Sequence, residues 1–127
     1  MSAQPTVVIA DDDNDIRQLI AVAVRKAGAV LIAEAGNGAA ALAAVRQSPP
    51  DLAILDVSMP ELSGLDVCRE LRKDPSTSSI RILLLSAAVH SAAIEEGLAA
   101  GADAYLTKPF SPRTLATQIR DLLPAVP

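Results

Sequence analysis

The 127-residue sequence has one cysteine, no tryptophan and only 2% aromatic residues. A single cysteine cannot form an internal disulfide. Because half of the residues are hydrophobic and so few are aromatic, the core must be built from Ala, Val, Leu and Ile. Cys68 lies among apolar positions of a predicted helix, which indicates a small core residue rather than a reactive thiol. The length suits one domain with a substantial core.

Basic residues are also scarce. Eleven Lys and Arg stand against fifteen Asp and Glu, the net charge is −4, and no basic run occurs. This composition argues against direct nucleic-acid binding, which needs a clustered basic patch. The apolar stretch at residues 7–10 is short and runs straight into acids, so it is neither a signal peptide nor a membrane span. We therefore expect a cytoplasmic protein that does not bind membranes.

Five short apolar runs alternate with five segments of helical period, a pattern typical of a parallel sheet with crossover helices. The predicted strands cover residues 7–10, 30–34, 52–55, 80–85 and 105–106. The fourth helix has the weakest apolar stripe, with Ile94 and Leu98 as its main anchors. The first has the clearest, made of Ile16, Leu19, Ile20, Ala23, Val24 and Ala27. The sequence therefore predicts an α/β fold with an open parallel sheet.

Residues suited to a phosphoryl site follow four of these strands. Asp11 and Asp12 follow the first strand, Asp56 the third, Ser86 the fourth and Lys108 the fifth. In an open parallel sheet, ligands bind in the crevice outside the carboxyl ends of the strands. We therefore expect these carboxylates, the hydroxyl and the lysine to form a pocket for a divalent cation and a phosphoryl group.

The acids favour a cation site over helix capping alone. Asp13 is suited to cap the helix that follows the first strand, but capping does not require a run of carboxylates. If the first and third strands are neighbours, Asp11, Asp12 and Asp56 converge and repel one another. A hard cation with oxygen ligands relieves this repulsion, and Mg²⁺ typically takes one or two carboxylates with water and a phosphate oxygen.

Beside a cation, Asp56 becomes a nucleophile that can form an aspartyl phosphate. The cation and Lys108 would neutralise charge on the transferring oxygens, and Ser86 could donate a hydrogen bond to one of them. Taken alone, each residue has a plainer interpretation: Asp56 starts a turn, Ser86 is structural and Lys108 is a solvated surface residue. Their occurrence together is what indicates the chemistry.

The set resembles the receiver domain of bacterial two-component response regulators, the chemotaxis regulator type in particular. The matching stretches are residues 11–12, the LDVSMP sequence at 55–60 with Gly64, residues 85–87 and residues 101–110. They occur in the right order over nearly the whole chain. The resemblance implies a doubly wound five-stranded parallel sheet of flavodoxin-like order 2-1-3-4-5 with helices on both faces. It also implies a single receiver domain over residues 1–127, with a core over about 6–123.

The resemblance assigns roles to the acids. Asp56 would accept a phosphoryl group from the phosphohistidine of a histidine kinase or phosphotransfer domain. Asp12, Asp56 and the backbone carbonyl of Ser58 would hold Mg²⁺, with Mn²⁺ as an alternative and Asp11 helping directly or through water. The domain would catalyse transfer only to itself, so we expect no turnover of a separate substrate and no enzyme in the ordinary sense.

The resemblance also implies a switch. Lys108 would pair with the phosphoryl group through a cis Lys108–Pro109 bond. Ser86 would move toward the phosphate, and Tyr105 would rotate inward behind it. The face formed by the fourth helix, fifth strand and fifth helix would then change and signal to an output domain or a downstream protein.

Two other functions remain as alternatives. Asp11-x-Asp13 after the first strand is similar to the motif of haloacid dehalogenase-like phosphatases, in which the second acid is a general acid. Those enzymes need a cap or a larger core, and they would leave Asp56 without a purpose. A phosphorylation-independent adaptor of the same fold would not need the complete acidic set. A calcium loop of the EF-hand type is excluded, since Ile16 and Val22 stand where Gly and Glu are required.

Overall fold

The computed structural model describes residues 4–123, in which strands and helices alternate throughout. The strands are β1 (Thr6–Ala10), β2 (Val30–Ala35), β3 (Leu52–Asp56), β4 (Arg81–Ser86) and β5 (Ala104–Thr107). The helices are α1 (Asn14–Lys26), α2 (Gly38–Gln47), α3 (Gly64–Lys73), α4 (Ser91–Ala99) and α5 (Pro112–Leu122). Of the domain expected over residues 1–127, residues 1–3 and 124–127 lie outside the described residues.

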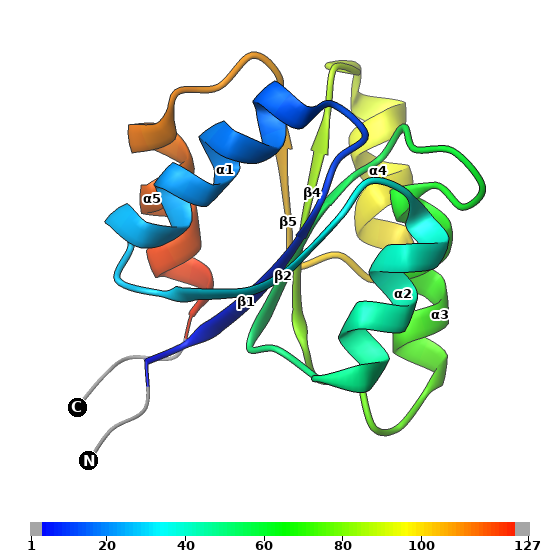
Figure 1. Ribbon diagram of the computed structural model, residues 1–127. Coiled ribbons are helices and arrows are strands. Elements are labelled where there is room, and N and C mark those ends of the chain that lie inside the picture. Colours follow the sequence, from blue (N-terminus) through cyan, green and yellow to red (C-terminus); the bar gives the residue numbers. More distant parts are fainter. Residues whose placement is uncertain (1–3, 124–127) are drawn as a thin grey trace.

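The sheet has the predicted topology. Its five strands lie in the order β2-β1-β3-β4-β5, and each neighbouring pair is parallel. Helices α1 and α5 cover one face, and α2, α3 and α4 cover the other (Figure 1). The doubly wound, flavodoxin-like α/β fold is therefore confirmed. All five strands end at the same edge of the sheet, which is where the predicted site residues occur.

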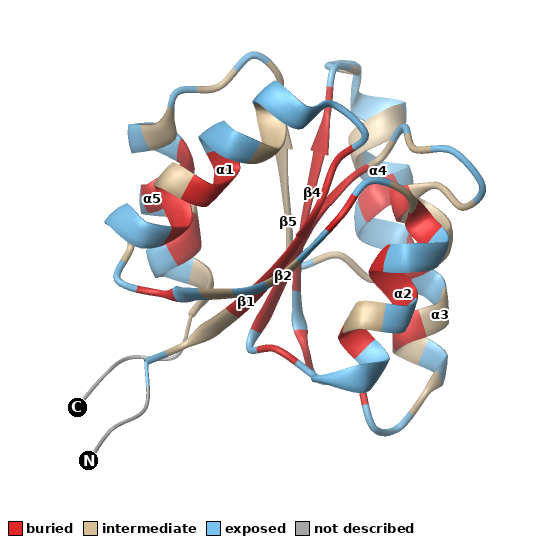
Figure 2. Ribbon diagram, viewed as in Figure 1, coloured by how far each residue is buried: buried red, intermediate tan, exposed pale blue. Residues whose placement is uncertain are grey.

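The core consists of two hydrophobic clusters separated by the sheet. Alternate residues of a strand point to opposite faces, so Val7 and Ile9 belong to the cluster under α1 and α5, while Val8 and Ala10 belong to the cluster under α2 and α3. Both clusters are mainly aliphatic, as the composition predicts. Cys68 is fully buried in the second cluster, which confirms its assignment as a small core residue. Figure 2 shows the central strands β1, β3 and β4 buried along most of their length.

Local sequence signals end and begin the helices as expected. The Asp13 carboxylate accepts hydrogen bonds from the backbone N–H groups of Asp15 and Ile16, at 2.9 and 3.2 Å, and so caps α1. Ser111 caps α5, with Pro112 at the first helical position. Gly28, which follows α1 after one intervening residue, has a φ of 81° that favours glycine.

Two predicted helix contacts are wrong. Leu98, expected to anchor α4, is 47% exposed, and Leu19, expected in the inner stripe of α1, is 40% exposed. Helix α4 instead packs through the buried Gly97: a Cβ atom there would lie 2.9 Å from the Tyr105 ring and 3.2 Å from a Leu84 methyl group. The backbone of α4 approaches β4 and β5 so closely at this point that Leu98, one residue on, faces solvent. Large side chains mark the inner face of a helix only where they fit between helix and sheet.

Candidate functional site

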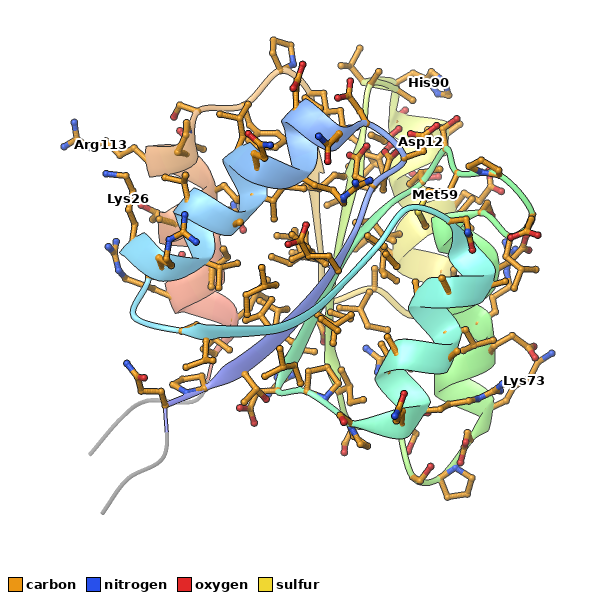
Figure 3. All side chains as sticks on the ribbon, viewed as in Figure 1. Asp12, Lys26, Met59, Lys73, His90 and Arg113 are labelled. Atoms are coloured by element: carbon orange, nitrogen blue, oxygen red, sulfur yellow. The ribbon has the colours of Figure 1, made fainter. Side chains whose placement is uncertain are left out.

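The strand ends bring the predicted site residues to one edge of the sheet. Asp11 directly follows β1, Asp56 is the last residue of β3 and Ser86 the last of β4, while Lys108 directly follows β5. In Figure 3, Asp12 is labelled where β1 gives way to α1, at this edge of the molecule. Parallel pairing is the cause of this convergence, since it places every strand's carboxyl end on the same side.

Lys108 bridges the two buried acids. Its Nζ atom lies 2.8 Å from Asp11 Oδ2 and 3.1 Å from Asp56 Oδ1. Asp11 is fully buried and Asp56 is 4% exposed, whereas the Lys108 side chain retains 21% of its exposure. The Lys108–Pro109 peptide bond is cis, and the backbone N–H of Lys108 donates to the Ser86 carbonyl at 2.8 Å. The two Nζ contacts place the ammonium group against both carboxylates, at the end of β5.

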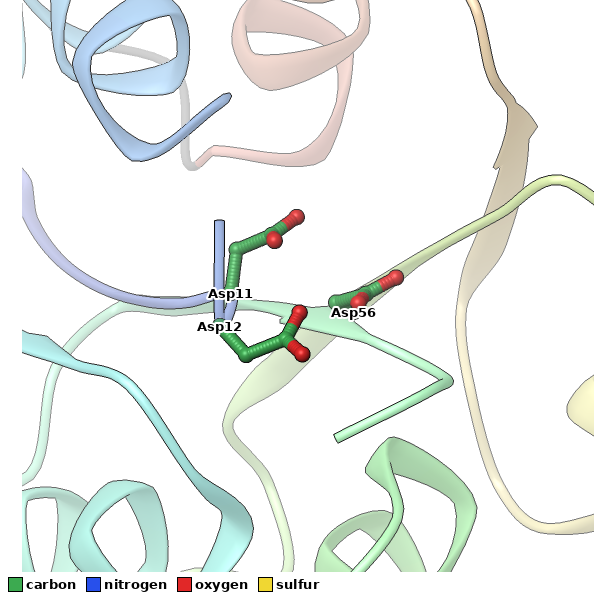
Figure 4. A group of neighbouring side chains, drawn as sticks. All are labelled: Asp11, Asp12 and Asp56. Carbon is green, nitrogen blue, oxygen red and sulfur yellow. The ribbon is translucent and has the colours of Figure 1, made fainter. Parts of the chain in front are cut away.

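The acids also form a candidate metal centre. Asp11, Asp12 and Asp56 each offer one carboxylate oxygen, and these oxygens lie within 4.8 Å of one another. Figure 4 shows the two acids at the end of β1 beside the acid from β3. Asp12 is exposed, so the cluster opens to solvent on its side. Three carboxylates around one space are the hard oxygen donors that Mg²⁺ prefers. Ser58 lies in an exposed position two residues after Asp56, and its predicted carbonyl ligand stays a prediction.

Burial and neighbouring charges shift two pKa values in the site. Burial raises the pKa of Asp56, and the negative charge of Asp11 raises it further; the hydrogen bond from Lys108 opposes both but does not cancel them. For Lys108, burial acts to lower the pKa, but the hydrogen bonds to Asp11 and Asp56 outweigh it and the pKa is raised. The site therefore holds more negative charge than one lysine balances, which is the condition that favours a bound cation.

This imbalance predicts a pH-dependent effect of Asp56→Asn. A raised pKa means that folded wild-type protein binds a proton more readily than unfolded chain, so its stability falls as pH rises from the ordinary value of 3.8 through the raised folded pKa. Asparagine carries no charge and escapes this loss. With a chelator present, we expect the free energy of unfolding of Asp56→Asn, relative to that of wild type, to increase over this pH range and then to level off. Urea unfolding at a series of pH values measures it, and an advantage that stays constant or shrinks with pH contradicts the assignment.

Ser86 and Tyr105 are linked through the segment after β4. The Ser86 hydroxyl accepts a hydrogen bond from the Ala88 N–H at 3.1 Å, and the Tyr105 hydroxyl donates to the Ala88 carbonyl at 3.1 Å. Ser86 is 8% exposed and Tyr105 is half-buried against α4 at Gly97. The two predicted switch residues thus contact the same backbone residue between β4 and α4.

Gly64 permits a close approach between two backbone segments beside the site. A Cβ atom on Gly64 would collide with the backbone oxygen of Asp56, and the Gly64 N–H donates to the Val57 carbonyl at 3.0 Å. The start of α3 therefore packs directly beneath the end of β3. Gly38, at the start of α2, has a similar role that the sequence did not indicate, because a side chain there would collide with the backbone of Leu62.

Asp13 does not join the acidic cluster. Its carboxylate caps α1, and Asp11 Oδ1 accepts a hydrogen bond from the Asp13 backbone N–H at 2.9 Å. An acid committed to capping is poorly placed as the general acid of an Asp11-x-Asp13 phosphatase, whose nucleophile would also be occupied by Lys108. The geometry therefore disfavours the phosphatase alternative.

Comparison with known proteins identifies the family. Residues 7–120 match the family model of the response regulator receiver domain. The chain is 41% identical over 118 residues to the phosphate regulon transcriptional regulatory protein PhoB of Pseudomonas aeruginosa, an alignment that covers 93% of this chain and 51% of that protein. It is 38% identical over 114 residues to the DNA-binding response regulator MtrA of Mycobacterium tuberculosis, covering 90% of this chain and 48% of that protein.

A solved structure agrees. The chemotaxis response regulator CheY4 of Vibrio cholerae matches with a TM-score of 0.88 and 30% sequence identity, over 95% of this chain and 100% of that one. The chain therefore belongs to the response regulator receiver family. It is a receiver domain of a two-component system, and it spans about half the length of the curated relatives it matches. Among residues 4–123, no helix combines the length and apolar character needed to cross a membrane.

Proposed function

We propose that this receiver domain accepts a phosphoryl group on Asp56 from the phosphohistidine of a histidine kinase or phosphotransfer protein, with Mg²⁺ or Mn²⁺ as cofactor. The observation that carries the proposal is the pairing of a buried Asp56 carboxylate with the Lys108 ammonium at 3.1 Å, beside two further acids that can share a cation. The domain acts in the cytoplasm and turns over no separate substrate.

The site residues have different roles in phosphoryl transfer. Asp12, Asp56 and the Ser58 carbonyl would hold the cation, with Asp11 assisting, and the bound cation would supply positive charge that offsets the negative charge of the acids and of the phosphoryl group. An Asp56 oxygen attacks phosphorus, so that the new O–P bond forms as the N–P bond of the donor histidine breaks and the imidazole leaves. Lys108 exchanges its contact with the Asp56 carboxylate for one with a phosphoryl oxygen, which neutralises charge at the reacting group.

The signal passes from the site to a surface. A phosphoryl group on Asp56 would add charge at the end of β3, next to the end of β4 that carries Ser86. A shift of Ser86 toward it would act on Ala88, whose N–H donates to Ser86 and whose carbonyl accepts the hydrogen bond from Tyr105. Movement of Tyr105 would then alter the face formed by α4, β5 and α5. The relatives PhoB and MtrA are named as transcriptional and DNA-binding regulators. We therefore infer that an output domain or a downstream protein binds this face and responds to its change.

Intact mass spectrometry tests the chemistry. Wild-type protein incubated with acetyl phosphate and Mg²⁺ is expected to gain the mass of one phosphoryl group, and Asp56→Asn is expected to gain none, because the amide is not a nucleophile for phosphorus. Asp121→Asn, at an exposed position of α5, serves as the matched control and should be modified like wild type. An unmodified wild-type protein, or equal modification of Asp56→Asn, overturns the proposal.

A further inference from the structure

We propose that Arg17 is a positioning residue for the cation site: it fixes the peptide group that joins Asp11 to Asp12. The inference rests on the proposed function in one respect, that the acids take up Mg²⁺. Arg17 lies in α1 with its side chain 20% exposed, and it contacts no transferring group itself. Its role is to hold the backbone from which the metal-binding acids project.

The guanidinium is fixed by three separate parts of the chain. Its Nη1 donates to the Asp11 carbonyl oxygen at 2.7 Å, and its Nη2 donates to the Asn14 side chain at 2.8 Å. Its Nε lies 3.6 Å from a carboxylate oxygen of Glu34 on β2. The guanidinium group is planar and rigid. Because it has contacts with the loop after β1, the first turn of α1 and the edge strand β2, it has little freedom to rotate. It can therefore restrain the group it contacts.

Asp11 and Asp12 differ sharply in how they are held. The Asp11 N–H donates to the Ala35 carbonyl at 3.1 Å, and both of its carboxylate oxygens have partners, Asp13 N–H and Lys108. The Asp12 carboxylate is exposed and accepts no hydrogen bond from any residue in the range 4–123. Its direction therefore depends on its backbone. The Asp11 carbonyl belongs to the same planar peptide group as the Asp12 nitrogen, so the Arg17 contact orients the Asp12 Cα.

Charge and position predict opposite effects of removing Arg17. The guanidinium is a positive charge next to an acidic cluster, and its loss alone would strengthen the binding of a cation. Loss of the hydrogen bond to the Asp11 carbonyl would instead let the peptide rotate and weaken binding, because ligand direction is no longer set in advance. The sign of the change in affinity thus distinguishes a positioning residue from a neighbouring charge.

Titration calorimetry with MgCl₂ measures this sign on four proteins: wild type, Arg17→Ala, Arg17→Gln and Arg113→Ala. We expect Arg17→Ala to bind Mg²⁺ roughly tenfold more weakly than wild type, as for other residues that orient metal ligands. Arg17→Gln, a neutral side chain that can still donate to the Asp11 carbonyl, is expected to recover part of this loss. Arg113 is an exposed arginine on α5, and its replacement should leave the affinity unchanged.

The same variants separate positioning from stability and from catalysis. Melting temperatures in chelator report any general loss of stability. In labelling with acetyl phosphate, the Mg²⁺ concentration for half-maximal rate should rise in Arg17→Ala, while the rate at saturating Mg²⁺ stays near that of wild type.

Each outcome decides the proposal. Arg17→Ala binding Mg²⁺ as tightly as wild type, or more tightly, overturns the role of Arg17 and leaves the proposed phosphoacceptor function intact. Wild-type protein that fails to bind Mg²⁺ overturns both. If Arg17→Ala does not fold, Arg17→Leu replaces it, since leucine keeps apolar bulk on α1 but has neither the charge nor the hydrogen-bond donor: weaker binding supports positioning, and equal or tighter binding overturns it.

Discussion

Replacing Lys108 by alanine is expected to slow phosphorylation of Asp56 by roughly 10²–10³-fold, the usual cost of removing one charge-stabilising donor from a reacting centre. The reason is geometric: the Lys108 ammonium lies 3.1 Å from an oxygen of the Asp56 carboxylate, so it is placed to neutralise the negative charge on the phosphoryl oxygens during transfer. The rate of mass gain with acetyl phosphate at saturating Mg²⁺ measures the effect. Lys73→Ala, at a lysine of α3 whose side chain is 75% exposed, is the matched control and should react like wild type.

The same substitution should change how the protein depends on Mg²⁺. Without the ammonium group, Asp11 and Asp56 remain buried and uncompensated, so Lys108→Ala is expected to be less stable than wild type in chelator. Added Mg²⁺ should then raise the melting temperature of the variant more than that of wild type. A phosphorylation rate that is unchanged in Lys108→Ala would show that the ion pair is only structural.

Replacing Arg72 by alanine is expected to lower the free energy of unfolding by about 3 kcal/mol, or the melting temperature by roughly 10 °C. Arg72 of α3 donates to three backbone carbonyls and pairs with the Asp103 carboxylate at 3.0 Å. The carbonyls belong to Gly101, Ser78 and Ile80, at 2.9, 2.9 and 2.6 Å. Truncation leaves these three carbonyls, in the segments that lead into β4 and β5, without the Arg72 donor. The Asp103 carboxylate loses its closest cation and keeps the hydrogen bond from the Ile82 N–H and the longer contact with Arg81.

Arg69, one turn earlier on the same helix, is a control of identical residue type. Its side chain is 45% exposed and pairs with Asp66 at 3.4 Å and Glu96 at 3.8 Å, both at the surface. Exposed pairs of this kind contribute little, so Arg69→Ala should change stability by less than about 0.5 kcal/mol. Chemical denaturation of both variants provides the comparison. Similar decreases in the free energy of unfolding of the two variants would contradict the prediction that the contacts of Arg72 stabilise the fold more than those of Arg69.

Much of the fold follows from local features of the sequence. Apolar runs mark the strands, Asp13 and Ser111 mark helix starts, and parallel strands necessarily bring their carboxyl ends together. That last fact is why Asp56 and Lys108 could be assigned to one site although they are far apart in the chain. The order of the strands came from the resemblance, because periodicity does not state which strands are neighbours.

Other features depend on three-dimensional contacts that leave no mark in the sequence. Arg17, Arg69 and Arg72 each follow an apolar residue and precede a polar one in a helix. Yet Arg17 donates to the loop that carries the acids, Arg69 lies at the surface, and Arg72 donates to three backbone carbonyls. Nothing in residue type or spacing separates them. The prediction for Leu98 was wrong for a related reason: the distance between α4 and the sheet, which decides whether a leucine or a glycine faces inward, is a property of the packed structure.

The division of the interior by the sheet has a consequence for how this chain can change. Substitutions in the layer of α1 and α5 touch different neighbours from those in the layer of α2, α3 and α4, so the two layers can drift in sequence almost independently. A one-residue insertion or deletion inside β1 or β3 is another matter. Beyond the change, it would exchange the residues that face the layer of α1 and α5 with those that face the layer of α2, α3 and α4, and so disrupt both layers in a single step.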